Sequence, residues 1–440
     1  METASRKITG EIEISEKGLE EIRSIKSVFD HQKKITEYLD APVTELIEII
    51  LGGAVQLDAS DVHIEPEEED VKIRIRIDGV LQEVLGIDAP VYKKLLSRIK
   101  LLSKLRLNIS DRPQDGRFSI VFDNTKIEIR ASSLPAEHGE TFVLRILDPR
   151  SLIELGTLGL RKNLLEIVEK EIKKPHGMIV VTGPTGSGKT TTLYAFCKKI
   201  KSSKIKIITI EDPIEYHLAG ISQTQVSAKK QLQLGGKTET RSYDFASGLK
   251  SIMRQDPDVI LVGEIRDEET VNTALQAALT GHLVLTTLHT NDAAGAVARL
   301  ISLGGKLANI GPAINMIIAQ RLARKVCLEC CKMVKPSPEE IEKIKKELNP
   351  LKMKIADDIK IPKANGCNLC NNTGYRGRIG FFEILLMGEE IEKFILKESS
   401  IAALRELAIK NGMTTIKQDG FLKVIEEMTT IEEIERVMGE

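Results

Sequence analysis

The sequence predicts an α/β protein in which an α+β region precedes a parallel sheet flanked by helices. Strand-like segments up to about residue 150 alternate apolar and polar residues and are separated by tight turns, as half-buried strands are. From Gly177 onward, short apolar runs alternate with helical segments, as expected for parallel strands that are buried on both faces. A glycine-rich loop lies where the first of these runs meets the first helix.

The composition restricts the classes of function. The 440 residues carry 63 Lys and Arg against 64 Asp and Glu, a formal charge of −1, so the overall charge does not favour nucleic acid or anionic lipid. No segment approaches the roughly 18 apolar residues of a membrane span. Glu11, Glu13 and Glu16 lie where a signal peptide would need an apolar run. We therefore expect a cytoplasmic protein with reduced thiols.

Residues 1–40 predict a helical amino-terminal extension. Leu19, Ile22, Ile25 and Phe29 recur at helical spacing, which favours one amphipathic helix. Such a helix either packs on the next domain or docks a partner, and the pattern leaves both interpretations open.

Residues 41–155 predict an α+β domain. Its first helix is expected to end at Gly52-Gly53. In Val71–Ile77 the odd positions are apolar and the even positions basic, which is the period of a half-buried strand, and Asp78-Gly79 then predicts a hairpin turn. A further helix and three strand-like segments complete the domain.

Residues 156–325 predict the parallel-sheet core. Its apolar strands are expected at Met178–Thr182, Lys206–Ile210, Val259–Val262 and Leu283–Leu288. Residues 326–380 interrupt this pattern with cysteines and charge and predict a separate module. Residues 381–440 predict a helical carboxyl-terminal subdomain.

The glycine-rich loop Gly183-Pro-Thr-Gly-Ser-Gly-Lys-Thr190 satisfies the phosphate-loop pattern G-x-x-x-x-G-K-[ST]. Its glycines allow backbone N–H groups to surround phosphates, and the following helix terminus adds positive potential. Lys189 is expected to reach the β- and γ-phosphates, and Thr190 to hold Mg²⁺. The predicted nucleotide contacts are Gly183, Pro184, Thr185, Gly186, Ser187, Gly188, Lys189, Thr190 and Thr191.

Hydrolysis needs further groups that position water and stabilise developing charge. Glu264 directly follows the end of an apolar strand, where ligands bind in parallel sheets, and is our first candidate for a catalytic carboxylate. A second strand leads into Glu211, Asp212 and Glu215, which are either groups that orient water or hold hydrated Mg²⁺, or solvated loop carboxylates. A third leads to His289, for which a phosphate-sensing and a structural role stay open.

Two C-x-x-C pairs, Cys327–Cys330 and Cys367–Cys370, predict a metal site. In a reducing compartment four thiolates can enclose tetrahedral Zn²⁺. A closed four-sulfur site is structural and would hold the intervening segment in place. Cys331 could replace Cys330, although the spacing of the second pair favours Cys330.

These motifs resemble one family, the secretion ATPases that power type II secretion and type IV pilus assembly. After the phosphate loop, Ile208–Glu215 resembles the family's aspartate box, Arg254–Asp267 its Walker B segment and Thr280–Asp292 its histidine box. The likeness extends to Ser60–Pro66, Arg76–Gly79, Arg112–Arg117 and Gln320–Leu322, and it covers the chain from about residue 42 to its end.

The resemblance implies a RecA-like ATPase core behind a smaller, PAS-like α+β domain, with ATP, Mg²⁺ and structural Zn²⁺. It implies that Glu264 is the catalytic carboxylate, that Glu211 assists with metal and water, and that His289 belongs to the site. It also implies a homohexamer in which arginines of the preceding domain neutralise charge on the γ-phosphoryl group. The arginines at the matching positions are Arg117, Arg130 and Arg145.

The family's partners are implied in the same way. They are an inner-membrane platform protein, with which the chain would associate peripherally, and a pilin or pseudopilin as indirect cargo. The four-cysteine module resembles the assembly and export branch rather than the retraction motors. A pilus, a DNA-uptake pseudopilus and a type II system stay open as the machine. The chain departs from the family in its short extension 1–40 and in a polar insertion, Lys229–Arg241, which is expected to be a surface loop.

Two other functions compete with this interpretation. A DNA-translocating ATPase would need a basic track, for which the candidates are Lys198, Lys199, Lys201, Lys204 and Lys206. A solvated helix face fits these lysines better, because the chain is nearly neutral and no aromatic residues alternate with them, so direct nucleic-acid binding is not expected. A nucleotide-gated scaffold without turnover is the other alternative, which the intact Lys189, Glu264 and Glu211 disfavour.

Overall fold

The computed structural model describes residues 10–234, 237–353, 355–356, 358–397 and 400–439. By internal contacts the chain divides into two compact units. The first comprises Met1–Ser151, Cys327–Cys331 and Ala364–Gly377, and the second Leu152–Val326, Lys332–Lys363 and Arg378–Glu440. Both cysteine pairs therefore belong to the first unit. Residues 1–9 of the predicted extension and 235–236 of the predicted insertion lie outside the described residues. The five domain boundaries drawn from the sequence stay predictions.

The first unit contains a seven-stranded sheet with the order β1-β5-β6-β7-β2-β3-β4. Its strands are β1 (Glu11–Glu13), β2 (Asp61–Pro66), β3 (Val71–Ile77), β4 (Val80–Ile87), β5 (Gln114–Phe122), β6 (Thr125–Ala136) and β7 (Gly139–Leu147). Neighbouring strands are antiparallel except β1, which pairs with β5 in parallel. The predicted hairpin at Asp78-Gly79 is confirmed: both residues have positive φ, as a two-residue turn between β3 and β4 requires.

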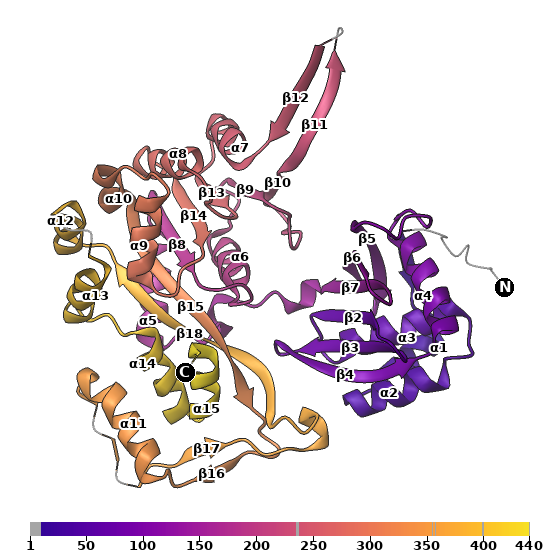
Figure 1. Ribbon diagram of the computed structural model, residues 1–440. Helices are drawn as coiled ribbons and strands as arrows, with labels where there is room; N and C mark the ends of the chain where they lie inside the picture. The colour runs from indigo at the N-terminus through magenta and orange to yellow at the C-terminus, as the bar shows by residue number, and fades with distance from the viewer. Residues whose placement is uncertain (1–9, 235–236, 354, 357, 398–399, 440) are drawn as a thin grey trace. The chain divides into compact units, whose positions relative to one another are not determined.

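Four helices gather on one side of this sheet and enclose its core (Figure 1). They are α1 (Glu16–Arg23), α2 (Val28–Glu37), α3 (Val43–Gln56) and α4 (Ala89–Leu102). The single helix expected in the extension is two helices. Ser27 begins α2 as its N-cap by accepting a hydrogen bond from the Asp30 N–H, and Phe29, expected on the buried face, is 72% exposed.

The expected end of the first helix of residues 41–155 at Gly52-Gly53 is wrong. Helix α3 continues to Gln56, with both glycines in its buried interior. A Cβ on Gly52 would lie 2.3 Å from Cδ1 of Ile22, and one on Gly53 would lie 2.4 Å from the His31 ring. The glycines therefore allow α1 and α2 to approach α3, and do not mark its end.

The second unit contains a seven-stranded sheet with the order β10-β9-β13-β14-β8-β15-β18. Its strands are β8 (Gly177–Thr182), β9 (Ile207–Glu211), β10 (Ser222–Gln225), β13 (Val259–Val262), β14 (Leu283–Leu288), β15 (Ile314–Val326) and β18 (Tyr375–Leu386). The strands from β10 to β15 are parallel to their neighbours. The predicted parallel-sheet core is thus confirmed.

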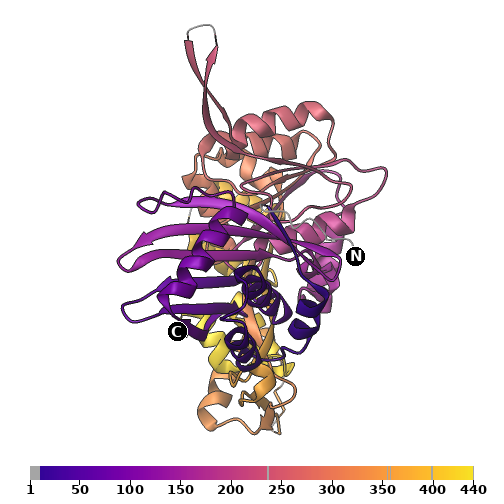
Figure 2. The same ribbon diagram turned by 90° about the vertical axis from the view of Figure 1, so that its right-hand side faces the viewer.

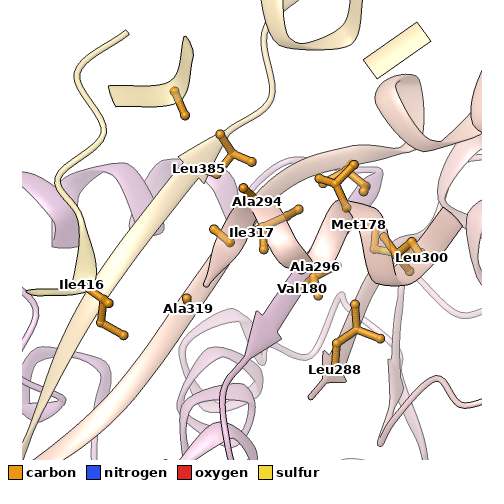
Figure 3. Packing of buried hydrophobic residues seen from close by; sticks show 14 of the residues in the cluster. Met178, Val180, Leu288, Ala294, Ala296, Leu300, Ile317, Ala319, Leu385 and Ile416 are labelled. Atoms are coloured by element: carbon orange, nitrogen blue, oxygen red, sulfur yellow. The ribbon is translucent and has the colours of Figure 1, made fainter. Parts of the chain in front are cut away.

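Both faces of this sheet are buried. Along β8, Met178 and Val180 belong to one hydrophobic cluster, part of which Figure 3 shows, and Ile179 and Val181 belong to another. The helices of the second unit are α5 (Lys162–Glu171), α6 (Lys189–Ile200), α7 (Phe245–Ile252), α8 (Glu268–Leu279), α9 (Ala293–Ser302), α10 (Leu307–Ala313), α11 (Pro338–Leu348), α12 (Glu389–Lys397), α13 (Ile401–Lys410), α14 (Ile416–Ile425) and α15 (Ile431–Met438). A doubly covered parallel sheet explains why these strands read as continuous apolar runs.

Two short antiparallel strand pairs lie outside this sheet. The insertion expected to be a surface loop instead forms an antiparallel pair, β11 (Ser227–Leu234) and β12 (Lys237–Tyr243), which extends away from the second unit's sheet in both views (Figures 1 and 2). The other pair is β16 (Lys332–Val334) and β17 (Ile361–Lys363). In the part of the chain that the structure describes, no helix is both long and apolar enough to cross a membrane.

Candidate nucleotide site

The phosphate loop connects the end of β8 at Thr182 to the first turn of α6. Gly183, Gly186 and Gly188 all have positive φ, at 152°, 80° and 85°, which side chains rarely tolerate. Gly188 is the N-cap of α6, and its carbonyl accepts the N–H of Thr192. The glycine spacing of the motif is therefore required by the backbone, which curls at the amino terminus of a helix where phosphates bind.

Lys189 lies folded against the loop that precedes it. Its Nζ donates to the carbonyl oxygens of Gly183 at 2.9 Å and Pro184 at 3.1 Å. Burial lowers the pKa of Lys189 to about 8, and the carboxylate of Glu264 acts in the opposite direction. The ammonium group of Lys189 therefore interacts with Glu264. It lies inside the loop, where a phosphate group would bind.

Glu264 lies just beyond the end of β13, beside Arg266 and the candidate residue His289. Its carboxylate pairs with Arg266 at 2.6 Å and lies 3.7 Å from Nε2 of His289, which follows β14. Burial, together with the positive charges of Lys189 and Arg266, lowers the pKa of His289, whereas Glu264 raises it. The structure thus brings Lys189, Glu264, Arg266 and His289 together at the carboxyl ends of three parallel strands.

Glu211 has a different environment. Its side chain is buried at the end of β9 and accepts hydrogen bonds from Thr209 Oγ1 at 2.5 Å, Gln223 Nε2 at 3.1 Å and the hydroxyl of Tyr194. Three donors hold this carboxylate in place within the unit. Tyr194 and Gln223 were not singled out in the sequence, because their only signal is a polar residue in an otherwise ordinary helix or edge strand.

A further polar residue, Gln320 on β15, packs against the phosphate loop. Ala319 pairs with Thr182, the last residue of β8, so Gln320 lies just beyond the end of that strand. Its side chain is buried, and Oε1 accepts the Thr192 hydroxyl at 2.7 Å. The sequence motif Gln320–Leu322 contained this residue but gave no indication of its contacts.

The predicted arginines form one row across the first unit's sheet. Arg117 lies opposite Arg130, and Arg130 lies opposite Arg145. The row continues through Asp61, which accepts a hydrogen bond from Arg145 Nε at 3.1 Å, to Arg76. Directly opposite residues share a face of the sheet, and the chain neighbours of these residues are core residues, so the row lies on the face away from the core. Arg76 was missed, although strand periodicity had assigned it to the polar face.

The four cysteines come together within the first unit. The ligand atoms of Cys327, Cys330, Cys367 and Cys370 all lie within 4.8 Å of one another, and two inter-pair Sγ distances are 3.8 Å. Four sulfurs about 2.3 Å from a central zinc would be about 3.8 Å apart, so the arrangement fits tetrahedral Zn²⁺. The group contains Cys330 rather than Cys331.

Comparison with known proteins identifies relatives over nearly the whole chain. Residues 36–436 match the family described as Type II/IV secretion system protein. Type II secretion system protein E of Xanthomonas campestris is 43% identical over 90% of this chain and 68% of its own. Type II secretion system ATPase E of Vibrio cholerae is 42% identical over 91% of this chain and 76% of its own.

Solved structures give the same fold. The pilus retraction motor PilT with bound ADP is similar with a TM-score of 0.56 and 27% identity, over 88% of this chain and 95% of that one. The ATPase DotB of Legionella pneumophila reaches a TM-score of 0.64 at 21% identity, over 89% of this chain and 95% of that one. At that identity the second likeness concerns the fold alone.

Proposed function

The chain belongs to the Type II/IV secretion system protein family, and from this premise we propose that it is a Mg²⁺-dependent ATP-hydrolysing motor of a secretion or pilus-assembly machine. The observation that carries the proposal is the grouping of Lys189, Glu264 and His289 beside the phosphate loop. The names of the relatives favour type II secretion among the possible machines.

Each residue of this group has a distinct task in the proposed reaction. Lys189 exchanges its loop carbonyl partners for phosphate oxygens and neutralises their charge. Glu264 orients the attacking water and accepts its proton, because it is the carboxylate that raises the pKa of this lysine. His289, with its pKa lowered and therefore neutral near pH 7, hydrogen bonds in the site without adding positive charge.

The residues present fit the nucleotide and the metal that the family implies. The positive-φ glycines leave the loop backbone open to phosphate oxygens, and Thr190 is exposed at the first turn of α6, where its hydroxyl would hold Mg²⁺. Bound Mg²⁺ would neutralise charge on the β- and γ-phosphates. Glu211 is proposed to support the site indirectly, since its carboxylate is engaged by three donors.

We further propose that the chain acts as a homohexamer on an inner-membrane platform, with a pilin-like subunit as indirect cargo. The row Arg117, Arg130 and Arg145 supports this assembly, because a polar sheet face that carries several arginines is suited to an anionic group. A DNA track is not supported by the candidate lysines. Lys198 and Lys199 pair with glutamates, and Lys201 and Lys206 donate to main-chain carbonyls.

The test is phosphate release by the full chain with Mg²⁺-ATP, with oligomer mass recorded in the same samples. Glu264→Gln is expected to bind ATP but to lower kcat about 100-fold or more, because an amide cannot accept a proton from water. Glu269→Gln is the matched control, since its exposed carboxylate lies in the following helix and pairs with Lys250.

Each outcome has a defined consequence. Turnover by the wild type and by Glu269→Gln, with loss in Glu264→Gln, supports the motor and the role of Glu264. Equal turnover in all three proteins contradicts that role. ATP binding by a hexamer without turnover in any of them, with the membrane platform present as well as absent, favours the nucleotide-gated scaffold.

A further inference from the structure

Gln320 is a buried polar side chain to which the reaction scheme above assigns no task. It lies on β15, which continues to Val326 although its pairing with β8 ends at Ala319 opposite Thr182. The extension of β15 therefore lies behind the phosphate loop. Only 1% of Gln320 is exposed, so its amide must find partners within the protein.

The amide of Gln320 contacts two parts of the nucleotide-binding element at once. Its Oε1 accepts the hydroxyl hydrogen of Thr192, a buried residue of α6, at 2.7 Å. Its Nε2 lies on the other side, where a Cβ placed on Gly188 would be only 3.0 Å away. The same side chain thus contacts the last glycine of the loop and the first turns of the helix that follows.

The main chain of Gln320 limits the loop at its opposite end. A Cβ placed on Gly183 would be 2.4 Å from the Gln320 carbonyl oxygen and 2.6 Å from Ser187 Oγ. The first and last glycines of the motif are therefore both packed against this one residue. A loop confined at both ends loses less conformational freedom when it receives phosphates.

We propose that Gln320 is a positioning residue of the phosphate loop. Its side-chain amide and its main-chain carbonyl, together with Thr192, hold the loop in the shape that receives a nucleoside triphosphate. The inference rests on the proposed function, because it concerns the same nucleotide site. Gln320 itself contacts the loop and not the reacting atoms, so its loss is expected to weaken nucleotide binding more than the chemical step.

Affinity for a fluorescent ADP analogue and the kinetic constants with ATP test this inference in the full chain. Gln320→Met keeps the length of the side chain but removes both hydrogen-bonding groups. We expect its Kd and KM to rise about 10-fold or more, with kcat at saturating ATP changed less than about threefold. Thr192→Val should raise Kd in the same direction, and Thr192→Ser, which keeps the hydroxyl, should bind like the wild type.

Gln418→Met is the matched control for a loss of general stability. Gln418 is another buried glutamine, whose Oε1 accepts the backbone N–H of Thr415. It lies in the first turn of α14, away from the loop in sequence and in hydrogen bonding. Its Kd is expected to stay at the wild-type value even if its melting temperature falls. The double variant of Thr192→Val with Gln320→Met should bind nucleotide no more weakly than Gln320→Met alone, because the hydrogen bond that Thr192→Val removes is already lost in Gln320→Met.

The possible results separate this inference from the proposed function. If the wild type binds nucleotide and Gln320→Met binds it equally well, the positioning role is wrong while the proposed function stands. If Gln320→Met and Gln418→Met lose affinity alike, the effect is general instability and the inference is overturned. If the wild type binds no nucleotide, both proposals fail together.

Discussion

At the scale of single residues, His31 shows what burial does to an ionisable group. The ring is fully buried beneath α3, and Nε2 lies 3.2 Å from the carbonyl oxygen of Ile49, to which it donates in the neutral ring. Burial lowers the pKa of His31 to about 4, although the backbone contacts with Ile49 and Ile50 act in the opposite direction. The folded first unit therefore contains a neutral histidine throughout the physiological range.

The stability of the first unit should depend on pH through this residue. An unfolded chain binds a proton at His31 below about pH 6.5, whereas the folded chain resists protonation until about pH 4. Stability is therefore expected to fall as the pH decreases between these values, by about 3 kcal/mol at most. Urea denaturation at several pH values measures this, with His31→Gln as the comparison.

The variant keeps a hydrogen-bond donor but does not titrate. It is expected to have a shallower decline of stability between pH 6.5 and pH 4 than the wild type, while the carboxylates common to both proteins contribute equally. Identical pH profiles would contradict a dominant role of His31.

At the scale of elements, α3 illustrates a helix that tolerates glycine because its neighbours need the space. A Cβ on Gly53 would approach Cδ2 and Nε2 of the His31 ring to 2.4 Å, and this ring cannot move easily because Ile49 holds it. The close approach of α2 and α3 thus depends on the absence of a side chain.

Gly53→Ala should therefore destabilise the protein, although alanine is the better helix former by about 1 kcal/mol. We expect a net loss of about 1–3 kcal/mol, because the new methyl group overpacks a closed core. Thermal unfolding measures this loss. Gln56→Ala, at the exposed end of the same helix, should change stability little, and an equal or higher melting temperature for Gly53→Ala would refute the packing argument.

The same helix shows why the sequence predicted some elements and not others. The parallel strands and the phosphate loop could be predicted because their patterns arise from the segment itself: an apolar run, then glycines that a tight backbone requires. Gly52 and Gly53 were misread because their cause lies in α1 and α2, which are distant in sequence. The hairpin β11–β12 was misread because a polar composition does not distinguish a loop from a pair of antiparallel strands.

The residues of the candidate site also differ in whether a local sequence pattern could identify them. Lys189, Glu264 and His289 could be identified because each follows a buried strand, and parallel strands bring their carboxyl ends to one edge. Gln320 and the donors around Glu211 could not, since their roles depend on pairs such as Thr192 and Gln320 that local patterns do not relate. The row from Arg117 to Arg76 required the register of five strands, which periodicity within one strand does not give.

At the scale of the whole molecule, the first unit is assembled from three separate segments of the chain. Two hydrogen bonds attach the second cysteine pair's segment to the amino-terminal part. Asn371 Oδ1 accepts the N–H of Val28, and Asp78 Oδ2 accepts the N–H of Gly377, both at 2.7 Å. Val28 is the first residue of α2, whose N–H has no partner within its own helix. The cysteine segments thus complete a helix end and a hairpin turn.

This assembly predicts how the first unit should respond to loss of the metal that its four cysteines are proposed to hold. Removal of Zn²⁺ by a chelator leaves four thiols without a common ligand, so the segments Cys327–Cys331 and Ala364–Gly377 should loosen. Amide hydrogen exchange of the full chain is then expected to accelerate within both segments and at Val28, while β8 and the phosphate loop keep their exchange rates.

Asn371→Gly tests the hydrogen bond between Asn371 and Val28 independently of the metal. Asn371 has a left-handed backbone, with φ of 50°, which glycine adopts without strain, so this variant removes the Val28 acceptor and leaves every cysteine in place. Exchange at Val28 should rise about fivefold, as expected for one lost hydrogen bond, with bound zinc unchanged. Asn372→Gly, at a neighbouring residue with φ of 58°, is the control and should exchange like the wild type. Faster exchange at Val28 in both variants would assign the effect to the added glycine. In the chelation experiment, unchanged exchange would mean that packing alone holds the two cysteine segments to the rest of the first unit.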